Sequence, residues 1–346
     1  ACFGETAGWE RAMWFAPPGV TPKDIYSHHR PNWYEHTAQE CRAAREGVVV
    51  FDQSSFGKIL IQGGDACAFL QHLCAGDVDV PVGKLIYTQL LNYRGGIEAD
   101  ITVDRLAADR YMIVSSATTH SRDLAWIERH LVSADRVVVT DVTSAYAVLS
   151  VQGPRSRDLL ASISDADLSN AAFPFLTSQE ISIGYAPAIA KRVTFVGELG
   201  WELYIPSEFA QSAFDTLTEA GQEFGLRLAG YHALEHLRCE RAYREFGLDL
   251  VPDDTPFEAG LGFSVKMDKP GGFIGRDALV SQRGKVLNKR LVMFKLADPE
   301  VLLFHDELIR LDGHIVGHIS SGAYSFTLGR SVGMGYVHQP DGVSLE

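Results

Sequence analysis

Apolar and polar positions alternate in short strand-like runs between residues 58 and 153, and helical periodicity separates several of them. The runs, rich in β-branched residues, are KILIQ (58–62), LIYTQLL (85–91), ADITVDRL (99–106), YMIVSS (111–116), RVVVTDV (136–142) and YAVLSVQG (146–153). Helices are predicted over 121–131, 156–163 and 65–74, where the leading Asp65 suits the exposed N–H groups. The turn sequence Asn-Tyr-Arg-Gly-Gly at 92–96 joins two strands as a hairpin. The pattern predicts an α+β fold with mixed or antiparallel sheets and excludes a purely parallel one.

The remaining segments show three further patterns. Residues 1–35 are rich in Trp, Pro and Gly without periodicity, which indicates an ordered wrap over another surface rather than a domain; a short helix is predicted over 36–46. VTFVGELGWELYI (193–205) predicts two strands pinched by Gly197 and Gly200, and helices are expected over 207–224 and 229–246. After a linker at 269–289, the runs RLVMFKL, ELIRL, HIVGHISSG and VGMGYV predict a separate small β-barrel or sandwich.

Composition narrows the class of protein. The 346 residues are 46% hydrophobic and 22% charged, as in globular proteins of two or three domains. A formal net charge of −13 argues against nucleic-acid or anionic-membrane binding. Five cysteines without a C-x-x-C pair indicate a reducing compartment. No apolar run approaches the roughly 18 residues of a membrane span, and the first residues lack a signal-peptide pattern.

One short motif suggests a metal site. HALEH (232–236) matches the H-x-x-E-H pattern of a zinc-peptidase class, in which two histidines four apart hold the metal. On a helical wheel His232, His236 and Glu240 share a face opposite the apolar stripe of Leu234 and Leu237. The sequence identifies no third ligand. We therefore expect a solvated polar helix face and predict no metal.

Longer motifs resemble a known family. The stretches LIYTQLLNYRGGIEADITV (85–103), VGELGWELYIP (196–206) and SSGAYSFTLGRSVGMGYV (320–337) resemble the tetrahydrofolate-binding glycine-cleavage T-protein (aminomethyltransferase) family. The stretches FGETAGWERAMWFAP (3–17), RPNWYEHTAQE (30–40), FDQSSFGKILIQG (51–63) and LRCERAYREFGLDLVPDDTPFEAGLGF (237–263) are similar to the folate-binding C-terminal half of sarcosine and dimethylglycine dehydrogenases and oxidases. The resemblance covers essentially the whole chain.

The resemblance implies a three-domain cloverleaf around a folate channel. Mapped here, residues 1–35 form an N-terminal segment, 36–55 plus 145–268 a discontinuous first domain, 56–144 a ferredoxin-like second domain, and 285–346 a C-terminal β-barrel. No G-x-G-x-x-G follows a first strand, so we expect FAD only on a partner domain or subunit. Family members usually continue beyond GMGYV, so we expect a piece of a longer polypeptide or a subunit of a heteromeric enzyme.

The resemblance also assigns roles to individual residues. Asp100 occupies the place of the carboxylate that serves the folate nitrogens, with a turn-capping aspartate as the alternative. Glu202 matches the family's pterin-binding glutamate, with a surface strand position as the alternative, since Glu198 is equally acidic. Tyr87 matches an aromatic of the folate site and is otherwise a core tyrosine. Arg238, in L-R-x-E, fits a ligand contact or a structural ion pair.

Four positions depart from the glycine-cleavage pattern. Phe195 replaces a tyrosine that often lines the site and keeps its stacking surface, and Ser115 stands in the place of an asparagine. Leu234 replaces an arginine that meets the folate tail. Ala99 precedes Asp100 where glycine-cleavage members usually carry two aspartates, as in the dehydrogenase branch.

The function implied is tetrahydrofolate-dependent capture of a one-carbon unit from an N-methyl amine such as sarcosine or dimethylglycine, as 5,10-methylenetetrahydrofolate. The expected partner is a flavin-containing amine dehydrogenase domain or subunit, without nucleic acid or membrane. The expected location is cytoplasmic in a bacterium or the mitochondrial matrix in a eukaryote. An O- or S-demethylase on the same fold and a non-catalytic interaction subunit are the alternatives.

Overall fold

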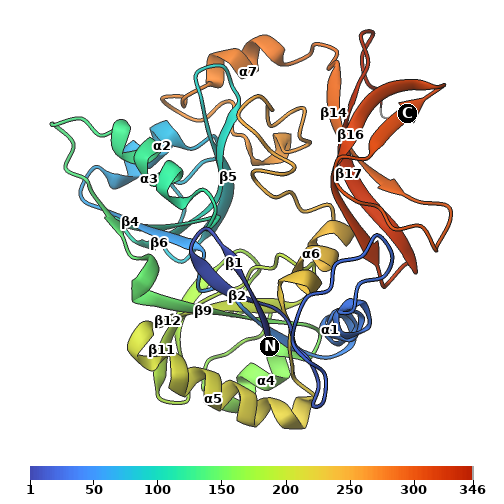
Figure 1. The fold of residues 1–346 in the computed structure, drawn as a ribbon. Coiled ribbons are helices and arrows are strands. Elements are labelled where there is room, and N and C mark those ends of the chain that lie inside the picture. Colours follow the sequence, from blue (N-terminus) through green and yellow to red (C-terminus); the bar gives the residue numbers. More distant parts are fainter. Residues whose placement is uncertain (345–346) are drawn as a thin grey trace.

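Three β-sheets surround a group of loops in the middle of the molecule (Figure 1). The structure is a computed structural model and describes residues 1–344. The sheets have five, six and four strands, and a separate hairpin lies at the N-terminus. Within the described residues no helix is both long and apolar enough to cross a membrane. The loops that follow residue 240 run between the sheets, so residues from all three regions approach one another there (Figure 1).

The five-stranded sheet has the order β5-β6-β7-β4-β8, with every pair antiparallel. Its elements are β4 (Gly57–Gln62), α2 (Ala66–Leu73), β5 (Leu85–Leu91), β6 (Ile97–Ala107), β7 (Arg110–Ser115), α3 (His120–Arg129) and β8 (Val138–Asp141). Every strand and helix predicted between 58 and 142 is present within three residues. One face, with Ile101 and Ile113, is buried against α2 and α3. Asp65 does not cap α2; its carboxylate instead binds Arg136.

The six-stranded sheet has the order β10-β11-β12-β9-β3-β13, and only the short β13–β3 pair is parallel. Its elements are β3 (Val49–Asp52), β9 (Tyr146–Gln152), α4 (Ser156–Ile163), β10 (Ser178–Ile183), β11 (Ala186–Lys191), β12 (Gly200–Pro206), α5 (Ala210–Gly221) and β13 (Arg227–Leu228). Its core includes Trp201, Leu203 and Phe173 under α4 and α5.

The prediction of two strands over 193–205 is wrong in its first half, because Val193–Leu199 is a loop before β12. The Thr194 hydroxyl accepts hydrogen bonds from the N–H groups of Val196, Gly197 and Glu198, which turns the chain away from a ladder. Gly197 has φ +76°, in the left-handed region that favours glycine.

The helix predicted over 229–246 is also shorter, since α6 spans only Tyr231–Glu240. The carbonyl of Arg238 accepts the N–H groups of Arg241 and Tyr243, and Ala242 has φ +53°, so the helix closes at its C-terminus. The helix expected over 207–224 is α5 flanked by single 3₁₀ turns. The loop after α6 therefore begins earlier than predicted and enters the centre of the molecule.

The N-terminal segment contains strands that its composition did not predict. Strands β1 (Cys2–Thr6) and β2 (Trp9–Trp14) form an antiparallel hairpin, and α1 spans Tyr34–Glu46. Glu40 of α1 accepts the N–H groups of Phe15 and Gly230, which joins the segment to the start of α6. The hairpin is therefore attached to the same helix that carries HALEH.

The C-terminal sheet has the order β14-β17-β16-β15 and is open rather than closed. Its strands are β14 (Lys289–Lys295), β15 (Leu308–Leu311), β16 (His314–Ser325) and β17 (Arg330–His338), close to the predicted runs. The predicted linker holds a further helix, α7 (Arg276–Gln282). Val332 and Met334 pack on Cys239 of α6, so this sheet is fixed to the same central helix.

Candidate functional site

Asp100 lies on β6 with its side chain on the face that is turned away from α2 and α3. Ala99 and Ile101 point into the helix-covered core, and strand alternation places Asp100 on the opposite face. The Tyr87 hydroxyl donates to its Oδ2 at 3.0 Å, and Gln89 Nε2 donates to its Oδ1 at 2.9 Å. The turn at 92–96 is capped by Asn92, not by Asp100, so the turn-capping alternative is excluded.

The environment of Asp100 tunes its proton affinity. Burial raises the pKa of the Asp100 carboxyl to about 6, against hydrogen bonds from Gln89 and Tyr87 and the charge of Arg244, which lower it. Burial also raises the pKa of Tyr87 well above its usual range, so its hydroxyl stays a donor. Asp100 is consequently ionised at neutral pH but ready to accept a proton near its own pKa.

A second segment completes this part of the site. Phe263 is 71% exposed, and its ring stacks on Tyr87 with 6.1 Å between ring centroids. Ser264 donates to Gln89 Oε1 at 2.6 Å, which fixes the amide that holds Asp100. Gln89, Phe263 and Arg244 were not among the site residues predicted from the sequence. Only Gln89 carried a signal, because it stands two residues after Tyr87 on the same strand face.

Glu202 lies on β12 and is buried, with 9% of its surface exposed, so the surface-strand alternative is wrong. The Tyr204 hydroxyl donates to Glu202 Oε2 at 2.8 Å. Among the described residues, no hydrogen-bond partner engages the second oxygen, Oε1. Burial raises the pKa of Glu202, against the Tyr204 hydrogen bond and the charge of Lys191. The carboxylate thus has one oxygen anchored and one free to accept donors from a ligand.

Two neighbouring residues of the loop after α6 interact with residues predicted for the site. Phe195, in the loop before β12, stacks on Tyr243 with centroids 6.0 Å apart. The next residue, Arg244, acts electrostatically on Asp100. The loop after α6 therefore contacts Phe195 and acts on Asp100, two of the residues predicted for the site.

Ser115 does not join this group. It pairs with Gly57 at the end of β7, and its neighbour Val114 is the one that lies opposite Thr102, on the same face as Asp100. Strand alternation therefore turns Ser115 to the other face, toward Asp123 of α3. Burial raises the pKa of Asp123 to about 6 as well.

Arg238 lies in a buried ion-pair network rather than on an open surface. It is 2% exposed and contacts Asp249 at 2.7 Å, Glu235 at 2.8 Å and Glu245 at 3.4 Å. It also donates to Ser321 of the C-terminal sheet. The geometry is that of a structural ion pair that joins α6, the following loop and β16.

The expectation of a solvated HALEH face is wrong. The His232 ring stacks on Trp33 with centroids 4.6 Å apart, and its Nε2 lies 3.6 Å from Asp24. His236 Nδ1 lies 2.8 Å from the Tyr324 carbonyl of β16. Burial lowers the pKa of both histidines. Across residues 1–344, no three His, Cys, Asp or Glu side chains gather as a metal site would require.

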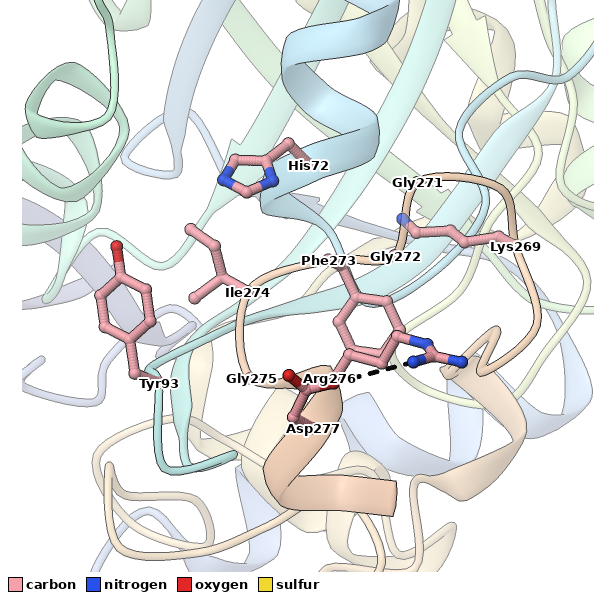
Figure 2. Close-up of a pocket in the computed structure, with 10 residues that line it drawn as sticks. All are labelled: His72, Tyr93, Lys269, Gly271, Gly272, Phe273, Ile274, Gly275, Arg276 and Asp277. Carbon is pink, nitrogen blue, oxygen red and sulfur yellow. Dashed lines mark ion pairs between the residues drawn. The ribbon is translucent and has the colours of Figure 1, made fainter. Parts of the chain in front are cut away.

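A separate cavity of about 520 Å³ opens beside the loop before α7 (Figure 2). Figure 2 shows Lys269 and Arg276 beside Gly271 and Gly272, an arrangement that resembles an anion cradle. The Lys269 ammonium, however, already donates to Gln71 Oε1 and to the carbonyls of Cys74 and Gly76. All three of its donors are used, so this cavity does not compete with the central region as the candidate site.

Comparison with known proteins identifies the family. Residues 1–269 match the model of the GCVT N-terminal domain, and residues 289–344 match that of the glycine cleavage T-protein C-terminal barrel domain. In fold, the chain is similar to the glycine cleavage system aminomethyltransferase T from Bartonella henselae. That likeness has a TM-score of 0.81 and 25% identity over 97% of this chain and 86% of that one.

Several curated relatives are longer proteins. The chain is 44% identical to 4-methylaminobutanoate oxidase (formaldehyde-forming) of Paenarthrobacter nicotinovorans, over 99% of this chain and 41% of the relative. It is 36% identical to human mitochondrial sarcosine dehydrogenase, over 99% and 42%, and 38% identical to the mouse pyruvate dehydrogenase phosphatase regulatory subunit, over 96% and 39%. The chain thus spans about two fifths of these relatives. Both family models match here and together cover nearly the whole chain, so it belongs to the glycine cleavage T-protein family.

Proposed function

We propose that this chain binds tetrahydrofolate and captures a one-carbon unit, released by oxidation of an N-methyl amine such as sarcosine or dimethylglycine, as 5,10-methylenetetrahydrofolate. The observation that carries the proposal is the Asp100 carboxyl, which is buried, has a pKa of about 6 and is held by Tyr87 and Gln89. Two relatives support the choice of donor, since their names specify a methylamino acid oxidase that forms formaldehyde and a sarcosine dehydrogenase.

The residues of the central region fit a reduced folate. The free oxygen of Glu202 and its partly anchored partner accept the adjacent N–H and amine groups of a pterin, in a bidentate and charge-assisted arrangement. The rings of Tyr87 and Phe263 on one side and of Phe195 and Tyr243 on the other offer faces to a flat heterocycle. We place the pterin at Glu202 and the reacting nitrogens at Asp100, within the three-domain division predicted from the sequence.

Tetrahydrofolate supplies two amine N–H groups. When the carbon of formaldehyde bridges the two nitrogens, both N–H bonds and the C=O bond break, and the oxygen leaves with the two protons as water. Asp100 is the group placed to accept such a proton, because it is ionised above pH 6 and faces the central region. Tyr87 and Gln89 each donate to one of its oxygens and so fix its orientation. Arg244 adds positive charge nearby, which favours the ionised form that a proton acceptor needs.

The oxidation that releases the one-carbon unit belongs, in this proposal, to a flavin-containing amine dehydrogenase domain or subunit. A non-catalytic role is the second candidate, because one relative is named as a regulatory subunit. The intact carboxylate site at Asp100 and Glu202 favours the catalytic role. An O- or S-demethylase would use the same folate site with a different donor.

Calorimetric titration of the chain with tetrahydrofolate tests the proposal. We expect saturable binding that Glu202→Gln weakens strongly, because an amide places a donor against the pterin donors. Glu198→Gln is the matched control: Glu198, the first acid of GELGWE, bonds to Arg45, so its loss leaves folate affinity unchanged. Absence of binding to the wild-type chain would exclude both proposed tetrahydrofolate-dependent activities, one-carbon capture and O- or S-demethylation. Assays with sarcosine, dimethylglycine and methyl ethers, with the amine-oxidising partner added, then identify the donor.

A further inference from the structure

A buried ion pair joins the two larger sheets at the edge of the candidate folate site. Lys191 of β11 and Asp104 of β6 are both essentially unexposed, and Lys191 Nζ lies 3.3 Å from Asp104 Oδ2. Ser178 of β10 donates to Asp104 Oδ1 at 2.6 Å. Asp104 stands four residues after Asp100 on the same face of β6, roughly 13 Å along the strand. The pair therefore belongs to the same surface as the candidate catalytic carboxylate.

Lys191 also faces the candidate pterin carboxylate. It is the direct cross-strand neighbour of Glu202 in the β11–β12 pair, so the two side chains share a face. Its ammonium lies 4.1 Å from the centroid of the Tyr204 ring, and the Tyr204 hydroxyl donates to Glu202. Lys191 and Tyr204 thus contact each other beside Glu202.

Stability alone gives little reason for a charge in this place. A buried ion pair is often replaced by apolar residues without loss of stability, because desolvation offsets the attraction. The surrounding interface is apolar, with Met112, Val114 and Val148 packed on Tyr204. An ammonium here does have a use if a neighbouring carboxylate must stay ionised although it is removed from water.

We propose that Lys191 is a positioning residue for folate binding: fixed by Asp104 and Ser178, its ammonium keeps Glu202 in the ionised form that accepts the N–H groups of a pterin. This inference rests on the proposed function and extends it to a residue that makes no contact with the ligand. Tyr204 completes the arrangement, because its hydroxyl holds one Glu202 oxygen and directs the other toward the ligand.

The groups that face Glu202 determine how binding responds to pH. They are Tyr204 on its own strand, Lys191 on β11 and the uncharged Ser150 on β9, with Asp104 across the interface as the partner of Lys191. Burial raises the pKa of Glu202, and Lys191 opposes that rise. Folate binding should therefore be lost as pH falls through this pKa. Removal of the ammonium should move the loss to higher pH.

The test is tetrahydrofolate affinity of Lys191→Met and Lys191→Arg, measured from pH 5.5 to 9. Below the pKa, a change of one pKa unit corresponds to a tenfold change in the ionised fraction, so we expect Lys191→Met to bind up to about tenfold more weakly at the acid end of this range and to recover wild-type affinity at high pH. Lys191→Arg keeps the charge and should retain the wild-type pH profile. A purely structural role would weaken binding equally at every pH.

Lys58 provides the matched control, since it is a second fully buried lysine near the same interface. Its ammonium donates to the Ser54 carbonyl and does not act on Glu202. Lys58→Met should leave the pH profile in place. Wild-type affinity and profile in Lys191→Met would overturn the inference, whereas no binding by the wild-type chain would instead overturn the proposed function.

A folding defect in Lys191→Met would not stop the test. The double variant Lys191→Met/Asp104→Asn removes both charges of the pair and so leaves no uncompensated buried carboxylate. The inference predicts the same upward shift of the pH dependence in this variant. A thermally stable double variant with the wild-type profile would overturn it.

Discussion

Two carboxylates on opposite faces of the five-stranded sheet have nearly the same proton affinity but very different surroundings. Burial raises the pKa of both Asp100 and Asp123 to about 6. Asp100 is bonded by Tyr87 and Gln89 from the neighbouring strand. Asp123, 1% exposed, is bonded by Thr119 one helical turn away and closed in by α3.

The difference shows that a raised pKa does not by itself mark a site. Asp100 faces loops from other parts of the chain, among them Arg244 and the exposed Phe263, and these provide charge and an open ring. Asp123 faces only the contact between its helix and the sheet. A carboxylate becomes a candidate catalyst where burial coincides with access for a ligand.

The largest expected effect separates these two carboxylates. We expect Asp100→Asn to slow the capture of formaldehyde on tetrahydrofolate at least 100-fold relative to wild type, because a proton acceptor contributes about 10²–10⁴. Asp123→Asn, the matched control, should change the rate less than twofold. The measurement is the rate of methylenetetrahydrofolate formation above the uncatalysed condensation. Equal losses in both variants would show that burial, and not position, explains the effect.

The pH dependence of the capture rate gives a second test of the difference between Asp100 and Asp123. Ionised Asp100 is the acceptor, so the rate should fall about tenfold per pH unit below its pKa of about 6. Rates at saturating tetrahydrofolate isolate this effect from that of Glu202 on binding. In Asp123→Asn the fall should remain. A fall that persists in Asp100→Asn would assign it to another group.

The motif positions identified candidate residues but not what surrounds them. Asp100, Tyr87 and Glu202 were located from short motifs, whereas Phe263 and Arg244, which surround Asp100, lie more than 140 residues from it in sequence. The Ser264–Gln89 contact spans 175 positions. Such contacts depend on how the loop after α6 crosses the molecule, which no local pattern encodes.

The strands, too, were predicted correctly where the local sequence determines them. The strands rich in β-branched residues, such as β7 and β9, were predicted because alternation and propensity agree. Strands β10 and β11 were not predicted, since the polar residues of SQEISI and the alanines and Pro187 of APAIAK weaken the signal there. The wrong strand prediction at Val193–Leu199 has a local cause, because the Thr194 hydroxyl binds nearby backbone N–H groups. This contact can be recognised only once the backbone conformation is known.

A stability measurement tests how much the ionised Asp100 carboxylate destabilises the fold. The pKa of Asp100 is raised in the folded state, so its ionisation destabilises the fold, and stability is lost as pH rises from about 4 through about 6. Asp100→Asn should remove this loss and gain about 1–2 kcal/mol in free energy of unfolding at pH 7.5. The gain should vanish near pH 4 in denaturant unfolding. A variant less stable at both pH values would show that the Tyr87 and Gln89 bonds outweigh the charge.

The smallest expected effect concerns Ser115, which motif position assigns to the ligand and strand alternation turns toward Asp123. If only side chains on the face of Asp100 affect ligand binding, Ser115→Ala changes tetrahydrofolate affinity less than twofold, because the Ser115 hydroxyl does not reach the central region. Tyr87→Phe is the comparison on the ligand face: it removes one donor from Asp100 and should weaken tetrahydrofolate binding more than Ser115→Ala does. Calorimetry on both variants decides the point. A loss of affinity in Ser115→Ala greater than that in Tyr87→Phe would mean that ligand binding reaches around the strand end, and the contrast between the two faces would then fail.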